Sequence, residues 1–339
     1  MSTLKSILKA REMSSFLFLV VLFGAVGMVN SDFLTAESLL NCLNDSVVFT
    51  LLAVGIAFVI LTGEIDVSIG ATLGFAAAVS STLLRDGTHW MIAMLAGIAV
   101  GALVGLINGW GVAILGIPSL IFTLGVNGMA RGLIYVYTKG AWVENLPPQF
   151  TRLSQQTILG GLTIFYAVSI IVVILAHTLL TRTRQGKYFV AVGDNMSGAA
   201  LVGIPTKQTK IAAYVLCGIF AAVAGIIYSS RIGFITPTAG NNYEMKAIAA
   251  CVLGGISLTG GLGSVVGASI GAIIMSSIGR ILVFLGFSSD YDNTITGVLI
   301  ITIVVVDALT QQRNAVKNRR ERLTVRTALS TPQKGGTEQ

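Results

Sequence analysis

Two carboxylates placed between apolar stretches are the most unusual reactive side chains of this sequence. Glu64 and Asp66 lie in the segment Gly-Glu-Ile-Asp, with long apolar runs on both sides. A carboxylate in such surroundings is energetically costly unless it faces water, a cation or another polar partner. The two acids therefore indicate a polar element of a permeation route or a structural lock. The alternative is an ordinary turn in which both carboxylates are solvated.

A second group of polar side chains follows one face of a predicted helix. Thr123, Asn127 and Arg131 are spaced by four residues, and side chains at this spacing share one side of an α-helix. In an otherwise apolar helix, this face either lines a path for a hydroxylated solute or makes hydrogen bonds to neighbouring helices. For Asn108, which is isolated in another apolar run, we favour hydrogen bonding between helices.

The polar segment 181–210 lies between two apolar halves and has the composition of a docking site. It carries Arg182, Arg184, Lys187, Lys207 and Lys210 against a single acid, Asp194. Its middle, 196–204, is predicted to form a short helix that Gly203 closes and Pro205 stops. A short helix flanked by cations suits docking onto another protein at the cytoplasmic face of a membrane.

Motifs typical of enzymes are missing from the sequence. It contains no GxxxxGK[ST] phosphate loop, no HExxH and no GxSxG, and its only imidazoles are His89 and His177. The three cysteines are isolated, without the spacing of a metal site, and are predicted to be buried packing residues. The chain is therefore expected to be neither an enzyme nor a metal-binding protein. If ATP powers its activity, another chain must hydrolyse it.

The elements that position these side chains are predicted to be membrane helices. The 339 residues are 54% hydrophobic and only 11% charged, whereas a soluble domain carries roughly 25% charged residues. Apolar runs of about 20 residues recur along the chain, as membrane-spanning helices require. The 39 glycines suit close contacts between such helices. The predicted fold class is all-α and polytopic.

About ten transmembrane helices are expected. Their approximate ranges are 14–31, 46–62, 67–84, 91–114, 119–137, 159–180, 211–229, 245–258, 263–285 and 293–309. Most lysines and arginines fall in three segments that the positive-inside rule places in the cytoplasm, so the net charge of +7 does not indicate nucleic-acid binding. The expected domains are a basic N-terminus (1–13), a transmembrane domain (14–309) that contains the cytoplasmic 181–210 loop, and a basic cytoplasmic tail (310–339).

An internal repeat supports this arrangement. Residues 61–74 align without gaps on residues 258–271, with six identical pairs and the spacing Gly-x-x-x-Gly in both copies. An even number of predicted crossings separates the copies, so the repeat is expected to have parallel topology. Chance matching of glycine and alanine in membrane helices is the alternative.

Four segments, in this order, resemble a known family. They are ILTGEIDVSIGA (60–71), IPSLIFTLGVNGMARGL (117–133), TRQGKYFVAVGDNMSGAALVGI (183–204) and EMKAIAACVLGGISLTGGLGSVVGA (244–268). Together they resemble the membrane permeases of ribose/xylose-type ATP-binding-cassette (ABC) importers, the inner membrane components of binding-protein-dependent transport systems, over residues 45–310. Within this family the sequence is most similar to permeases for autoinducer-2, and rhamnose-type permeases are also close.

The resemblance implies a subunit that works with partners in the bacterial inner (plasma) membrane. The family combines two permease subunits, identical or different, with ABC ATPase subunits that hold ATP and Mg²⁺ and with a periplasmic or extracellular solute-binding protein. No cofactor is implied for the permease chain itself. The loop after the sixth span is implied to couple the permease to the ATPase. On this sequence the coupling residues are Gly186, Lys187, Asp194, Asn195, Ala199, Ala200, Leu201, Gly203 and Ile204.

The expected function is import of a small hydroxylated solute, either autoinducer-2 or a monosaccharide such as rhamnose, ribose or another pentose or hexose. The candidate residues of the translocation path are Thr62, Glu64, Asp66, Ser68, Thr72, Thr123 and Asn127. The alternative is a secondary transporter, driven by an ion gradient, with Glu64 and Asp66 as its ion site. The lack of acids in the second repeat copy and the cationic 181–210 loop favour the ABC permease.

Overall fold

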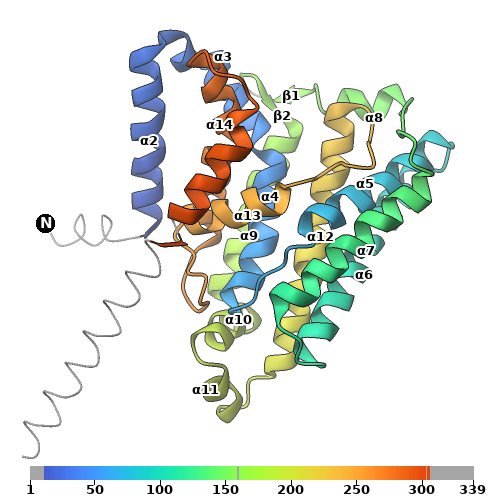
Figure 1. Cartoon of the computed structure of the whole chain (residues 1–339), viewed down its shortest axis with the longest axis vertical. Coiled ribbons are helices and arrows are strands. Elements are labelled where there is room, and N and C mark those ends of the chain that lie inside the picture. The colour runs from blue at the N-terminus through green and yellow to red at the C-terminus, as the bar shows by residue number, and fades with distance from the viewer. Residues whose placement is uncertain (1–10, 159, 303, 306–339) are drawn as a thin grey trace, which may run out of the picture.

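The computed structural model describes residues 11–158, 160–302 and 304–305, and its architecture is mainly helical, as expected (Figure 1). The elements are α2 (Arg11–Val29), η1 (Ser31–Leu34), α3 (Ala36–Asp45), α4 (Val47–Leu61), α5 (Ile69–Arg85), α6 (Trp90–Ala113), α7 (Ser119–Thr138), α8 (Pro148–Leu153), β1 (Thr157–Ile158), β2 (Leu162–Thr163), α9 (Ile164–Arg182), α10 (Arg184–Asp194), α11 (Met196–Leu201), α12 (Thr206–Ile232), α13 (Tyr243–Leu253) and α14 (Val265–Phe284). Residues 291–302 are also helical. β1 and β2 form a small antiparallel hairpin.

Six helices of the described chain are long and apolar enough to cross a membrane: α2, α6, α7, α9, α12 and α14. The number is seven if α3 and α4, which meet at a bend of 42°, form one broken span. The helices in the third and eighth predicted spans are shorter, since α5 has 17 residues and α13 has 11. The tenth predicted span, 293–309, extends beyond the described residues. The chain is thus a polytopic membrane protein, and its described residues form fewer full-length spans than the ten expected, because turns interrupt several apolar stretches.

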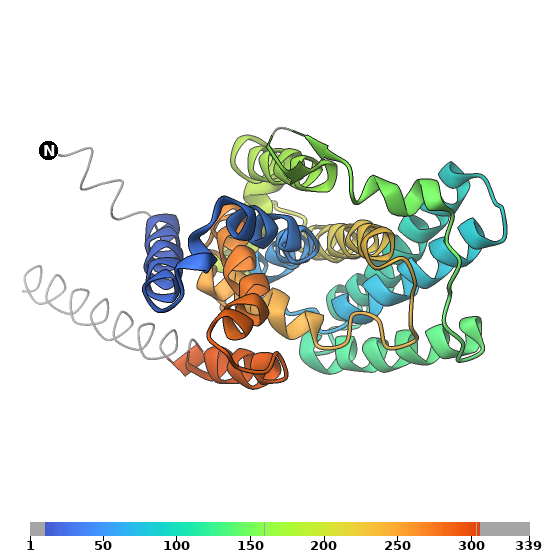
Figure 2. The same cartoon turned by 90° about the horizontal axis from the view of Figure 1, so that it is seen from above.

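Helix α4 forms the centre of the hydrophobic core. All 15 of its residues are buried and none is charged. A helix that is apolar on every side lies either in a protein core or in a membrane. Helices α9, α12, α13 and α14 pack around α4. In the view from above, α4 and α12 lie inside the bundle, with α2 and α7 at its rim (Figure 2).

Helix α12 is the second central element, and it lies directly against α6. A Cβ atom added at Gly101 would lie 2.2 Å from the carbonyl oxygen of Gly218, and one added at Gly105 would lie 2.2 Å from that of Tyr214. Side chains larger than hydrogen would separate the two backbones, so glycine permits this contact. The contact holds Asn108, one turn further along α6, against the protein interior.

The two ends of the bundle carry different elements. Helices α10 and α11 lie at one end, whereas α3, α8 and the β1–β2 hairpin lie at the other (Figure 1). This separation gives the molecule one end made by the 181–210 segment and an opposite end made by the longer connections before α4 and α9.

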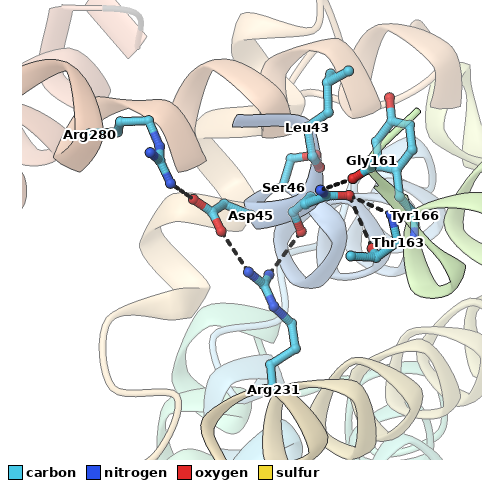
Figure 3. A network of polar contacts seen from close by, with 9 residues as sticks. Leu43, Asp45, Ser46, Gly161, Thr163, Tyr166, Arg231 and Arg280 are labelled. Atoms are coloured by element: carbon cyan, nitrogen blue, oxygen red, sulfur yellow. Dashed lines mark hydrogen bonds and ion pairs between the residues drawn. The ribbon is translucent and has the colours of Figure 1, made fainter. Parts of the chain in front are cut away.

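Asp45, the last residue of α3, links three helices near the end of the bundle that carries α3, α8 and the hairpin (Figure 3). Its two carboxylate oxygens lie 2.6 Å from an Nη of Arg231 on α12 and 2.7 Å from an Nη of Arg280 on α14. The neighbouring Asn44 donates a hydrogen bond of 3.0 Å to the carbonyl oxygen of Gly161 in the hairpin. The bend between α3 and α4 is therefore held by polar contacts with α12, α14 and the hairpin.

Replacing Asp45 by alanine is expected to destabilise the folded protein by about 1 kcal/mol, because both arginines lose their carboxylate partner. The effect is small since the Asp45 side chain is 37% exposed and water screens both pairs. Thermal unfolding of the purified protein in detergent measures the change. Asp86→Ala is the matched control, because the Asp86–Arg85 pair is more exposed and local. Identical unfolding temperatures for the two variants would contradict the linking role of Asp45.

Candidate functional site

The 181–210 segment forms two helices, α10 and α11, where the sequence predicts only the second. Helix α10 begins after Thr183, whose hydroxyl accepts a hydrogen bond of 2.9 Å from the N–H of Gly186. Its buried face contains Gly186, Phe189 and Val192. The ring of Phe189 packs edge-on against Phe58 of α4, with 5.3 Å between the ring centroids. Helix α10 therefore attaches this end of the molecule to the core.

Helix α11 confirms the predicted short helix and its stop signal. The side-chain oxygen of Asn195 accepts a hydrogen bond of 2.8 Å from the N–H of Gly198, which caps the helix. Gly203 has a φ of +83°, in the left-handed region that favours glycine. The N–H groups of Gly203 and Ile204 then donate to carbonyl oxygens inside α11, and the chain turns into Pro205.

The tip of α11 presents apolar side chains to the outside of the molecule. Leu201 is 89% exposed and Val202 is 76% exposed. Two adjacent apolar side chains at the end of a short projecting helix suit contact with another protein. Among the predicted coupling residues, Gly186 and Ala199 are buried, Ile204 is half-buried, and Lys187, Asp194, Asn195, Ala200, Leu201 and Gly203 are exposed.

Lys210 does not belong to the cationic docking surface that the sequence suggests, because its side chain turns into the protein. Its Nζ atom lies 2.5 Å from a carboxylate oxygen of Glu64, and the two side chains are only 11% and 16% exposed. The pair joins the start of α12 to the turn between α4 and α5. The interpretation of this turn as an ordinary solvated one is therefore wrong for Glu64.

Asp66 is more deeply buried and is surrounded by hydrogen-bond donors. It is 2% exposed. One carboxylate oxygen accepts hydrogen bonds from the N–H and the hydroxyl of Ser68, at 2.8 and 2.7 Å. The side-chain amide of Asn108 on α6 donates to the same carboxylate at 3.3 Å and to the Ser68 hydroxyl at 2.7 Å. Asn108 thus makes hydrogen bonds from α6 to the turn before α5, and not to another helix as the sequence favours, and the cluster locks this turn onto α6.

Helix α10 ends where the two repeat copies meet. The N–H of Gly261 donates a hydrogen bond of 3.0 Å to the carbonyl oxygen of Leu61. A Cβ atom added at Gly193 would lie 2.0 Å from that same oxygen and 2.6 Å from the Gly261 nitrogen. A Cβ atom added at Gly260 would lie 2.6 Å from the nitrogen of Gly63. Three segments that are distant in the sequence therefore touch backbone to backbone, in what we call the glycine junction (residues 61–63, 193–194 and 259–261).

The predicted path residues fall into two groups in the structure. Thr62, Asp66, Ser68, Thr72 and Thr123 are buried. Their polar atoms bond to neighbouring protein groups; the Thr123 hydroxyl, for example, accepts from the N–H of Val67 at 3.1 Å. Glu64 pairs with Lys210.

Asn127 is the predicted path residue that lines a cavity in the described part of the chain. The cavity has a volume of about 410 Å³ and includes Arg131, which shares the helix face of Asn127, and Tyr135. Sequence reasoning misses Asn241 and Glu244, which line the cavity from the other side, because no spacing relates them to α7.

Comparison with known proteins places the chain among transport permeases. Residues 38–304 match the protein family described as "Branched-chain amino acid transport system / permease component". The autoinducer 2 import system permease protein LsrC of Enterobacter sp. (strain 638) is 40% identical over 319 residues, which cover 93% of both chains. The protein of the same name from Escherichia coli (strain K12 / DH10B) is 39% identical over 90% of this chain and 89% of its own. No solved structure gives a significant match to the chain.

Proposed function

Because the chain belongs to this family of permease components, as the match over residues 38–304 shows, we propose that it is the transmembrane subunit of an ABC importer for autoinducer-2. The observation that carries the proposal is the 40% identity to an autoinducer 2 import permease over 93% of both chains. Monosaccharides such as rhamnose or ribose are the alternative solutes. The chain lies in the bacterial inner membrane, as its relatives and its membrane-length helices indicate.

The proposed topology has ten crossings. Four further crossings, made by α3–α4, α5, α13 and the helix at 291–302, add to the six full-length spans. The end that carries α10 and α11 lies in the cytoplasm. Residues 1–13 and 310–339 are then cytoplasmic extensions of a transmembrane domain at 14–309. The glycines of both repeat copies permit close backbone contact, which supports the repeat itself. Cβ atoms added at Gly70 and Gly74 would lie 2.5 Å from carbonyl oxygens, and those at Gly267 and Gly271 would lie 2.0 Å from carbonyl oxygens.

The proposed assembly contains a second permease subunit, an ABC ATPase that binds ATP and Mg²⁺, and a solute-binding protein at the outer end. The permease itself hydrolyses nothing. Closure of the ATPase around ATP displaces the exposed tip of α11 (Leu201 and Val202). Helix α10 carries this displacement to the glycine junction, and therefore to the end of α4 and the turn before α14. The two halves of the permease then alternate between conformations open to opposite sides of the membrane.

Replacing Gly203 by tryptophan tests the coupling role and is expected to abolish uptake of autoinducer-2 while leaving the protein in the membrane. A Cβ atom at Gly203 would meet no described atom within 4 Å, so the side chain has room in the isolated chain. It would instead occupy the docking surface and strain a left-handed residue by about 1–2 kcal/mol. The measurement is autoinducer-2 uptake by the complete complex in proteoliposomes, together with ATP hydrolysis.

Gly116→Trp is the matched control for this experiment. Gly116 also has a positive φ, of 71°, and open space around its Cβ position among the described residues, but it lies in the turn between α6 and α7. The control carries the same backbone strain without touching α11. Normal uptake by Gly203→Trp, or equal loss in both variants, would refute the coupling role.

A further inference from the structure

The cavity beside α7 is polar for a site among membrane helices. It lies between α7 and the segment that connects α12 to α13, and its volume of about 410 Å³ falls in the lower part of the range typical of small-molecule sites, about 300–1,000 Å³. Its lining includes Asn127, Arg131, Tyr135, Thr238, Asn241 and Glu244. Amides, hydroxyls and one charge of each sign provide many hydrogen-bonding groups and no net charge.

Helix α7 is open on much of its surface. It is the least apolar of the six full-length spans. Cβ atoms added at Gly125, Gly128 and Gly132 would find no neighbour within 4 Å in the described chain. A helix surface that faces lipid is destabilised by asparagine or arginine near its middle. The position of Asn127 therefore indicates that this part of α7 does not face lipid.

The charged groups of the cavity have different roles. Arg131 donates hydrogen bonds to the carbonyl oxygens of Ala239 and Gly240, at 2.5 and 2.8 Å. Its guanidinium is thus used to hold the wall of the cavity and is not a free anion site. Glu244 is 8% exposed, and its Oε2 atom has no hydrogen-bond partner among the described residues. The side-chain oxygen of Asn127 is also buried without a partner in that part of the chain.

Two buried acceptors without a partner among the described residues belong to side chains that line one cavity, and they favour a ligand that donates hydrogen bonds once these side chains turn toward it. A buried acceptor without a partner destabilises the protein, and a hydrogen-bond donor in the ligand removes this cost. Several hydroxyl groups on a small neutral solute provide such donors, whereas an anion would bring more acceptors beside Glu244. Resting on the proposed function, we propose that this cavity is the site where the permease binds a neutral polyhydroxylated solute during translocation. Asn127 and Glu244 accept hydrogen bonds from the solute hydroxyls, and Arg131 is a positioning residue.

Cysteine labelling of the complete complex in proteoliposomes tests this site. The native Cys42, Cys217 and Cys251 are buried, so the wild-type chain provides an unreactive background. The thiol of Asn127→Cys is expected to react with a hydrophilic thiol reagent at least about tenfold faster than that of Met129→Cys. Met129 is 47% exposed on the same helix but lies outside the cavity. Autoinducer-2, supplied with its binding protein and ATP, is expected to slow the labelling of Asn127→Cys only.

An uptake assay provides the second measurement. Asn127→Leu removes the acceptor and is expected to lower autoinducer-2 uptake at least about tenfold, whereas Asn127→Asp keeps an acceptor and retains more uptake. Tyr135→Phe is expected to reduce uptake, and Tyr137→Phe, two residues away and outside the cavity, is expected to have no effect.

The possible results of these two assays distinguish a failure of the proposed site from a failure of the proposed function. A wild-type complex that imports autoinducer-2 while Asn127→Cys stays unreactive, or reacts without protection, would overturn the site and leave the importer assignment standing. A wild-type complex that imports no autoinducer-2 would overturn the assigned solute. Labelling of Asn127→Cys in the presence of rhamnose and ribose would then decide whether the cavity binds a solute. Protection of this cysteine by either sugar supports the site, and protection by neither overturns it.

Discussion

Replacing Gly193 by alanine is expected to reduce uptake at least about tenfold, although the change adds a single methyl group. The new Cβ atom would lie 2.0 Å from the carbonyl oxygen of Leu61 and 2.6 Å from the nitrogen of Gly261. Both obstacles are backbone atoms, so no side-chain rotation relieves the overlap. The end of α10 must move away from the glycine junction, which disrupts the backbone contact between α10 and both repeat copies.

Three measurements distinguish this loss of coupling from misfolding. We expect Gly193→Ala to reach the membrane in reduced but measurable amount and to hydrolyse ATP with its partner while transporting little solute per ATP. Gly24→Ala on α2 is the matched control, since its Cβ position is open within the described chain, and it is expected to behave as wild type. Wild-type transport per ATP by Gly193→Ala would show that the glycine junction does not transmit the displacement of α11.

Some of the long helices could be predicted closely because lipid imposes length and apolarity on each span. The predicted spans 91–114 and 119–137 correspond to α6 (Trp90–Ala113) and α7 (Ser119–Thr138) within one residue at each end. Helix α10 was missed because the segment is polar overall. Its signals were the cap residue Thr183 and the apolar residues Phe189 and Val192 at a spacing of three, which indicate one buried helix face.

The role of a polar residue in a membrane bundle could not be predicted from its position on a helix alone. Thr123 and Asn127 share one face of α7, one turn apart. Thr123 lies under the turn between α4 and α5, where its hydroxyl accepts from the N–H of Val67. Asn127 lies beyond that turn and reaches the cavity. The difference depends on where a distant segment crosses α7, and helix periodicity contains no such information.

The glycine junction was also beyond sequence reasoning, although its residues were visible. The repeat alignment singles out Gly63 and Gly260 as equivalent positions. Their close contact with each other, and with Gly193, joins three segments that are distant in the sequence. A glycine placed for close approach and a glycine placed for a turn look the same in one sequence, so the contact required the structure.

Removing the charge of Glu64 alone is expected to be severely damaging. Glu64→Leu leaves the Lys210 ammonium buried, with its side chain only 11% exposed and without its carboxylate partner. Breaking a buried ion pair from one side typically costs about 3–5 kcal/mol, which is a large share of the stability of most proteins. The expected result is a strong loss of folded protein from the membrane, measured by its amount in detergent extracts and by its unfolding temperature.

The double variant Glu64→Leu/Lys210→Met decides between a structural and an ion-translocating role for this pair. Replacing both partners by apolar residues of similar size is often neutral or stabilising, because no unpaired charge is left behind. If the pair only holds the turn between α4 and α5 against α12, the double variant regains folding together with ATP-dependent uptake. If Glu64 belonged to the ion site of a secondary transporter, the double variant would fold and yet fail to transport. Restored uptake in ATP-loaded vesicles, unchanged when proton and sodium gradients are collapsed, is the result we expect, because Glu64 already has its cation within the protein.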